Sequence, residues 1–222
     1  MTSKITPELP DRLPLDISVI SDFFPSLPEE TIDKFRIMSQ LYPEWNEKIN
    51  VISRKDIDNL LVNHILHSLA IAKFIRFTPG STIIDLGTGG GFPGIPLAAI
   101  FQNVHFHLID RIGKKLTVAA DIAQKCDLRN VSIQHGDIGE CKVLADFVVS
   151  RAVMPQPDIV KLVRKNISKI QNNALPNGVI ALKGGNLDAE IKPLASRTEI
   201  IDIADYFPLP FFETKKIVYT SI

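Results

Sequence analysis

A glycine-rich segment carries the strongest chemical signal in the sequence. It reads Asp85-Leu-Gly-Thr-Gly-Gly-Gly-Phe-Pro-Gly94 and overlaps a short apolar run at residues 82–86, so it lies where a strand would end and a helix begin. Glycines at such a turn let the backbone approach a ligand closely, and the N–H groups that open the helix can face that ligand. Asp110 ends a second apolar run about 20 residues further on, at the spacing typical of nucleotide sites.

This segment permits two interpretations. Residues 89–94 satisfy G-x-G-x-x-G, the fingerprint of nicotinamide dinucleotide sites. Residues 85–91 satisfy D-x-G-x-G-x-G, the pattern of methyltransferases that use S-adenosylmethionine (SAM). A carboxylate at Asp85 repels a pyrophosphate, but it favours the sulfonium and ammonium groups of SAM, directly or through water. The sequence therefore favours SAM as the ligand, with Asp85, Gly87 and Gly89 among the residues that bind it.

Two further acids follow predicted strands. Asp110, at the tip of a neighbouring parallel strand, can accept hydrogen bonds from both ribose hydroxyls. After a third apolar run, Gly136-Asp-Ile-Gly139 offers an adenine edge the side chain of Asp137 and the N–H of Ile138. A plain turn explains the last four residues equally well, and both interpretations stay open.

The order of apolar runs predicts the elements that position these residues. Strands are expected at residues 82–86, 104–109, 131–134, 146–149 and 178–182, with helices at 95–101, 115–125 and 155–171 between them. Strands that alternate with helices predict an α/β fold with a parallel sheet covered on both faces. Residues 199–203 and 216–219 have no helix between them and predict a terminal antiparallel pair.

The N-terminal third of the chain is organised differently. Residues 1–25 are rich in proline and acid and predict an irregular arm. Residues 26–77 place apolar side chains at helical spacing in two stretches, the first interrupted by Pro43, and predict a helical extension. The expected division is thus an arm at 1–25, the extension at 26–77 and the α/β domain at 78–222.

Composition excludes several classes of protein. The 222 residues are 45% hydrophobic and 23% charged, with 25 basic and 25 acidic side chains, which is typical of a globular chain. No apolar run approaches the roughly 20 residues of a membrane span, and two cysteines are too few for a disulfide scaffold. We therefore expect a protein of the cytoplasm that has no membrane contact and no metal, and that is a monomer.

Several motifs occur together in the order of one family. They are Trp45-Asn-Glu-Lys-Ile-Asn-Val-Ile-Ser53, His64-Ile-Leu-His-Ser-Leu69, the glycine-rich segment extended to Leu97, Ser150-Arg-Ala-Val153 and Ala181-Leu-Lys-Gly184. In these motifs the chain resembles the bacterial 16S rRNA guanine-N7 methyltransferases, the glucose-inhibited division protein B family, over roughly residues 30–185. The stretch Gly-Phe-Pro-Gly-Ile-Pro is more specific than the glycines alone.

The resemblance implies a class I SAM-dependent methyltransferase fold, Rossmann-like, with an N-terminal helical extension. It implies SAM as donor, and as substrate a guanine in the 530 loop of 16S rRNA, free or within the small ribosomal subunit. The donor contacts of the family fall on Gly87, Phe92, the Ile138–Gly139 pair and Arg151. The family usually has Asp where this chain has His67, and often Arg-Ala-Glu at 137–139, so contacts there are expected to involve the backbone.

Guanine N7 carries a lone pair and no proton, so methyl transfer needs no general base. Catalysis then consists mainly of positioning and electrostatics. Arg151 and Lys183 follow the fourth and fifth predicted strands, where an open sheet binds ligands, and are candidate catalytic residues that contact the guanine acceptor edge or a phosphate. The alternative is that each residue is an ordinary surface charge, and this alternative is stronger for Lys183 than for Arg151.

Other polar residues have weaker signals. Two pairs of polar residues have i, i+4 spacing: Asn46 with Asn50, and His64 with Ser68. In one interpretation they line the mouth of the donor pocket. The favoured interpretation is that they cap the helices or hydrogen-bond to one another. Four basic residues of the predicted helix at 155–171 share one face that rRNA phosphates could contact; a solvated face explains them nearly as well. They are Lys161, Arg164, Lys165 and Lys169. The alternative functions are methylation of a small molecule or protein, and an inactive RNA-binding or assembly module.

Overall fold

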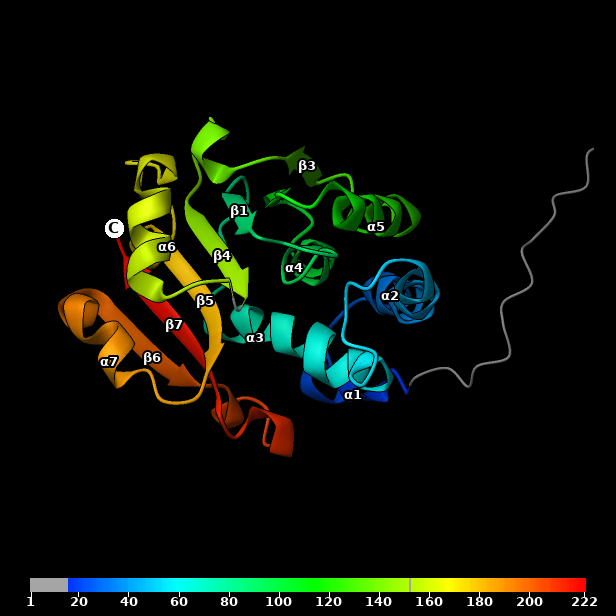
Figure 1. Ribbon diagram of the computed structural model, residues 1–222. Helices are drawn as coiled ribbons and strands as arrows, with labels where there is room; N and C mark the ends of the chain where they lie inside the picture. The colour runs from blue at the N-terminus through cyan, green and yellow to red at the C-terminus, as the bar shows by residue number, and fades with distance from the viewer. Residues whose placement is uncertain (1–15, 152) are drawn as a thin grey trace, which may run out of the picture.

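The computed structural model describes residues 16–151 and 153–222. Within these residues seven strands form one sheet in the order β3-β2-β1-β4-β5-β7-β6 (Figure 1). The strands are β1 (Thr82–Leu86), β2 (His105–Asp110), β3 (Val131–His135), β4 (Phe147–Arg151), β5 (Gly178–Gly184), β6 (Thr198–Asp202) and β7 (Lys215–Ser221). The first five are parallel, and β7 is antiparallel to both β5 and β6. The predicted α/β class and the antiparallel terminal pair are confirmed.

The strand β1 explains why the sheet is covered on both faces. Ile83 and Ile84 are both fully buried, and because successive side chains of a strand alternate they face opposite layers. Ile83 belongs to the hydrophobic cluster shared with the N-terminal helices, and Ile84 to the cluster shared with α6. A strand that is apolar on both faces needs helices above and below it, as parallel sheets generally do.

Helices fill both layers. The longer ones are α2 (Glu29–Lys48), α3 (His67–Phe74), α4 (Gly94–Ile100), α5 (Gly113–Lys125) and α6 (Gln156–Val163), with the shorter α1 (Ser18–Phe23) and α7 (Asp188–Ile191). Short 3-10 turns are η1 (Ile57–Asn59), η3 (Ile138–Glu140), η4 (Arg164–Asn166), η5 (Lys192–Arg197), η6 (Ile203–Asp205) and η7 (Pro210–Phe212). Among these described helices, none has the length and apolar character to cross a bilayer.

The helical extension packs against the sheet domain. Helix α2 contacts α4 and α5, and α3 contacts α4, on the side of the sheet opposite α6 (Figure 1). Phe35, Tyr42 and Leu69 of the extension are fully buried in the same cluster as Phe106 and Phe147 of the sheet. The extension therefore shares the hydrophobic core of the sheet domain and is held against α4 and α5.

The extension differs from the expected pair of helices in two places. Helix α2 runs through Pro43, because its buried face continues on both sides of the missing N–H, with Met38 and Tyr42 before it and Asn46 after it. The second expected helix begins as the 3-10 turn η1, continues as a π-helix, η2 (Leu60–Leu66), and becomes α-helical only at His67. Such wider turns are frequent at functional sites, and this one carries Asn63 and His64.

Two other expectations need correction. Residues 18–23, expected in the irregular arm, form α1, which buries Ile20; residues 1–15 of that arm lie outside the described residues. The helix expected at 155–171 ends at Val163, and η4 ends at Asn166. The Asn166 amide donates to two carbonyls of the chain before β4, those of Cys141 and Val143, at 3.0 Å each. These bonds turn the chain so that Ile167 bridges to Ala145.

The basic face expected on that helix is therefore wrong for Lys169, which the helix does not reach. Lys161 lies in α6, Arg164 and Lys165 in η4, and Lys169 beyond the helix. Lys165 instead donates a hydrogen bond to the carbonyl of Gly139.

Candidate active site

The loop between β1 and α4 is held by a buried carboxyl group. Asp85 is fully buried, and its Oδ2 accepts hydrogen bonds from Thr88 Oγ1 at 2.6 Å and from the Gly94 N–H at 2.8 Å. A Cβ at Gly94 would lie 2.7 Å from that oxygen, so only glycine permits this contact. Asp85 thus ties the end of the strand to the first turn of the helix.

The second oxygen of Asp85 has a different environment. Oδ1 is buried and has no hydrogen-bond partner among the described residues. Burial raises the pKa of Asp85 to about 7, against the hydrogen bonds from Thr88 and Gly94 and the charge of Arg151, which lower it. The predicted attraction of Asp85 for a cationic ligand thus stays a prediction, and Oδ1 is the atom through which it would act.

Two glycines let the backbone of the loop approach neighbouring residues closely. Gly87 has φ +68°, a left-handed conformation that strains other residues, and a Cβ there would lie 2.7 Å from Val153 Cγ2. Gly89 has φ +58°, and its N–H donates to Asp110 Oδ2 at 2.8 Å. The loop therefore lies directly against the chain that leaves β4, and it is fixed by the acid at the end of β2.

Asp110 lies at the carboxyl end of β2, as the sequence predicted. Its Oδ1 accepts from the Ile112 N–H at 2.8 Å while Oδ2 accepts from Gly89. Each carboxylate oxygen has a second lone pair, so the residue can still accept bonds from a ligand. The structure thus adds a loop-fixing role to the predicted ribose contact, which remains a prediction.

The turn after β3 uses the side chain of Asp137 internally. Its Oδ1 accepts from the Gly139 N–H at 2.6 Å, and Oδ2 pairs with Arg111. These partners hold the pKa of Asp137 below its usual range. Ile138 is buried beneath the turn. The Asp137 carboxylate is thus occupied in this conformation, which leaves the backbone of Ile138 and Gly139 for the predicted adenine contact.

Phe92 connects the glycine loop to the helical extension. Its ring stacks on Tyr42, with centroids 4.5 Å apart, and lies 5.4 Å from the ring of His64. Tyr42 also donates a hydrogen bond from Oη to the Gly90 carbonyl at 3.0 Å. The side chain of Phe92 is consequently buried, and α2 holds the loop in place from above.

Arg151 stands at the centre of the site. Its guanidinium carbon lies 4.9 Å from the centre of the Phe92 ring, a cation–π contact. Burial lowers the pKa of Arg151 to about 10, and the nearby acids Asp85 and Asp56 oppose this shift, so the group stays protonated at neutral pH. No carboxylate of the described chain comes within 4.0 Å of it to form an ion pair. Its N–H donors therefore remain available to a ligand.

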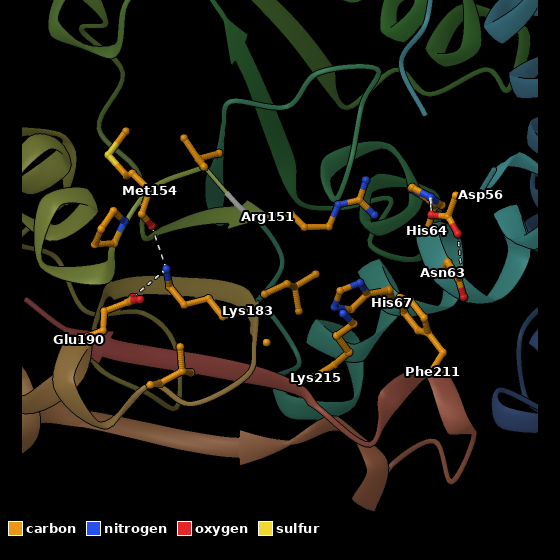
Figure 2. A pocket seen from close by; sticks show the side chains of 15 residues that line it. Asp56, Asn63, His64, His67, Arg151, Met154, Lys183, Glu190, Phe211 and Lys215 are labelled. Atoms are coloured by element: carbon orange, nitrogen blue, oxygen red, sulfur yellow. Dashed lines mark hydrogen bonds and ion pairs between the residues drawn. The ribbon is translucent and has the colours of Figure 1, made fainter. Parts of the chain in front are cut away.

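Arg151 also lines a cavity of about 630 Å³ (Figure 2). It is lined by the ends of β4 and β5, the start of β7, the helix α7, and the helical segment that includes η2. We call it the acceptor cavity. Because Gly87 contacts Val153, a lining residue, the loop and the acceptor cavity share one wall.

Lys183 lines the acceptor cavity but its ammonium is occupied. Nζ donates to the Met154 carbonyl at 2.8 Å and pairs with Glu190 Oε1 at 2.9 Å. Glu190 also accepts from the Gln156 N–H at 2.7 Å. Lys183 therefore braces the segment after β4 against α7, as Figure 2 shows, and a catalytic role for it stays a prediction.

The helical extension supplies polar groups whose role the sequence spacing did not reveal. His64 Nε2 lies 2.6 Å from Asp56 Oδ2, and Asn63 donates to Asp56 Oδ1 at 2.5 Å. Burial, together with the charge of Arg151, lowers the pKa of His64 to about 4, so this imidazole is neutral. All three residues line the acceptor cavity. Ser68 instead donates to the His64 carbonyl, the internal pairing that was favoured.

Other lining residues come from the C-terminal segment. Phe211 and Lys215 reach the acceptor cavity, with the Lys215 ammonium 4.9 Å from the Phe211 ring centre. No motif singles them out, because they follow a loop far from the glycine segment. Asn46 lies elsewhere: its side chain bonds the backbone of Val51 and Ile52 and shapes the turn after α2. Among the described residues, no group of His, Cys, Asp or Glu could hold a metal ion.

Comparisons with known proteins agree with this geometry. The family model described as rRNA small subunit methyltransferase G (GidB) matches residues 31–216, beyond the 30–185 expected from motifs. Ribosomal RNA small subunit methyltransferase G of Parabacteroides distasonis is 54% identical over 92% of this chain and 89% of its own length. The protein of the same name from Bacteroides thetaiotaomicron is 53% identical over 93% of this chain and all of its own.

Solved structures show the fold. A SAM-dependent O-methyltransferase from Thermotoga maritima is 18% identical with a TM-score of 0.55, covering 75% of this chain and 70% of its own. Fibrillarin from Aeropyrum pernix, solved with bound S-adenosyl-L-methionine, is 15% identical with a TM-score of 0.51, covering 70% and 73%. The fold is that of the class I SAM-dependent methyltransferases, as expected.

Proposed function

Because this chain belongs to the rRNA small subunit methyltransferase G family, it is a SAM-dependent rRNA methyltransferase, and we propose that it methylates N7 of a guanine in the 530 loop of 16S rRNA. The observation that supports this most directly is the position of Arg151. Its guanidinium packs over Phe92 of the glycine loop and also lines the acceptor cavity, at the boundary between a donor site and an acceptor site.

The residues present fit SAM. Gly87 has a left-handed conformation and no room for a side chain beside the loop, and Asp85 Oδ1 is an unpaired buried oxygen that a cationic ligand can use. Asp110 is a carboxylate with lone pairs left for ribose hydroxyls. When bound, SAM supplies a methyl group on a positively charged sulfur. We infer that the glycine loop, Asp110 and the backbone of Ile138 and Gly139 hold the donor.

The acceptor cavity suits a methyl acceptor that needs no general base. Guanine N7 has an in-plane lone pair and no proton, so the residues have only to orient the ring and exclude water. Methyl transfer leaves the guanine ring positively charged, and a cation beside it does not stabilise that product. Arg151 therefore acts as a positioning donor: one N–H to guanine O6 leaves N7 free to react.

Basic residues beside the acceptor cavity support an RNA substrate. Arg54 and Lys55 are exposed and immediately precede Asp56, a lining residue, and Lys215 also lines the cavity. We infer that they contact phosphates that flank the target base. Phosphate contacts fix the register of the RNA, and the cavity then receives one base that leaves the stack.

Identification of the product tests this function. The purified protein is incubated with isotopically labelled SAM and either free 16S rRNA or small ribosomal subunits, and the digested RNA is analysed by mass spectrometry. We expect 7-methylguanosine in the 530-loop fragment. Label on another atom or in another fragment would contradict the target. Label that enters only protein or a metabolite would refute RNA methylation itself.

A further inference from the structure

His67 is a buried group that the mechanism above leaves unused. Its side chain is 6% exposed and lines the acceptor cavity, yet Nε2 has no hydrogen-bond partner in the part of the chain that the structure describes. Buried polar atoms are rarely left unpaired, since each costs the free energy of its lost hydration. Such an atom at a ligand cavity indicates that the ligand supplies the partner.

The hydrogen bonding of His67 determines what that partner is. The ring donates to the backbone of Asn63, and because Nε2 is the unpaired nitrogen, the donor is Nδ1–H. Burial and the charges of Arg151 and Lys215 hold the pKa of His67 well below 6.5, so the ring is neutral. Nε2 is then an acceptor, and it requires an N–H or O–H group on the ligand.

The two histidines of the acceptor cavity contact different segments: His64 contacts the glycine loop and His67 contacts η7. His64 packs on Phe92 of that loop, with ring centroids 5.4 Å apart. His67 packs edge-on against Phe211 and Phe212 of η7, at 5.5 and 5.9 Å. Figure 2 shows Arg151, His64 and His67 directed toward the same space, with His67 on the side of Phe211 and Lys215. A base whose N7 faces the loop thus presents its opposite end to His67.

In guanine the group opposite N7 is the amino group at C2. We propose that His67 Nε2 accepts a hydrogen bond from the N2 amino group of the target guanine and selects guanine over purines that lack this group. The inference rests on the proposed function, because it assumes that guanine N7 is the reacting atom. Adenine also has an N7 but no amino group at C2, so its binding would leave Nε2 unpaired, and sites that lose such a bond discriminate strongly.

The test measures base preference within each variant, so that a general loss of activity cancels. The substrate is 16S rRNA carrying guanine or inosine at the target position, as free RNA and in reconstituted small subunits. Inosine lacks only the N2 amino group and keeps N7, O6 and N1–H. We expect the wild-type kcat/KM to be about tenfold higher for guanine, the scale of losing one hydrogen bond to a buried acceptor. Equal values for the two bases in the wild-type enzyme would overturn the proposal without any variant.

Three variants assign the preference to Nε2. His67→Phe keeps an aromatic ring without an acceptor, and we expect its guanine-to-inosine ratio to fall to about one. His67→Gln restores an acceptor and should recover the preference in part. His105→Phe, at the exposed start of β2, makes the same change away from the acceptor cavity and should retain the wild-type ratio. An unchanged ratio in His67→Phe would overturn the proposal.

A third substrate separates this inference from the proposed function. RNA with 7-deazaguanine at the target keeps the N2 amino group but has carbon in place of N7. Methylation of that nucleotide, or no transfer to guanine RNA at all, would refute the proposed function. Transfer to guanine and not to 7-deazaguanine, with no effect of His67→Phe on the guanine-to-inosine ratio, would refute only the role of His67.

Discussion

The buried carboxyl of Asp85 predicts a specific dependence of stability on pH. Its pKa is about 7 in the folded protein, against an ordinary value of 3.8 that applies to the unfolded chain. Folding therefore favours the protonated form. The resulting stabilisation is complete below pH 3.8 and is lost as the pH rises through 7, where a carboxylate must be buried. At about 1.4 kcal/mol per pKa unit, the loss between pH 5 and pH 8 is about 2–3 kcal/mol.

The substitution Asp85→Asn isolates this contribution. The amide keeps an oxygen for Thr88 and Gly94 but has no charge to titrate. We expect the free energy of unfolding of the variant, minus that of the wild type, to be about 2–3 kcal/mol larger at pH 8 than at pH 5, because only the wild type loses stability as the carboxyl group ionises. Urea unfolding followed by the fluorescence of Trp45, the single tryptophan, measures it at both pH values.

A second variant checks that the carboxyl group itself is responsible. Thr88→Val removes a hydrogen bond that lowers the pKa of Asp85, so the pH range over which stability is lost should move upward. If the difference between wild type and Asp85→Asn is the same at pH 5 and pH 8, then Asp85 is ionised throughout and the reasoning from burial is wrong. The Asn variant should also bind SAM more weakly at pH 8, because no charge is left to attract the donor.

Four further outcomes follow from the site. Asp110→Ala should weaken SAM binding by roughly 1–3 kcal/mol in calorimetry; wild-type affinity would exclude the ribose contact. Arg151→Ala should lower the methyl-transfer rate at saturating RNA and SAM, and an unchanged rate would make the residue an ordinary surface charge. Tyr42→Phe removes the hydrogen bond to the glycine loop and should cost about 1 kcal/mol in urea unfolding; no change would show that α2 does not hold the loop through it. Arg54→Gln with Lys55→Gln should reduce the slope of log affinity for 16S rRNA against log salt concentration by up to about two, without changing SAM binding; an equal slope would place the RNA elsewhere.

Much of the donor side of the candidate site could be predicted from the sequence, because its residues are close together in the chain. The glycine loop follows β1 directly, and backbone conformations such as that of Gly87 depend on residue type at one position. The parallel order of the strands then brings Asp110 and Arg151 to the same edge, since the carboxyl ends of parallel strands meet there. Predictions from local sequence were wrong where tertiary hydrogen bonds ended an element. The hydrogen bonds of Asn166, for example, end the helix that was expected to reach residue 171.

The acceptor half depended on the tertiary structure. Its walls come from the helical extension, the ends of β4 and β5, and the start of β7, which are distant in the sequence and share no periodic pattern. Antiparallel β7 lies between β5 and β6, and this insertion carries Phe211 and Lys215 to the acceptor cavity. The π-helical turn likewise sets the positions of His64 and His67 in a way that α-helical spacing does not predict.

The sequence by itself thus determined the fold class, the donor and the strand-end residues, because each depends on short-range chemistry repeated at regular intervals. Only the tertiary structure decided which charges are free and which are occupied. Lys183 and Arg151 both follow predicted strands. In the structure Glu190 and the Met154 carbonyl hold Lys183, and Arg151 lines the acceptor cavity without an ion-pair partner among the described residues. Pairing and burial depend on groups far apart in the chain, and these set both the pKa of a side chain and its freedom to bind.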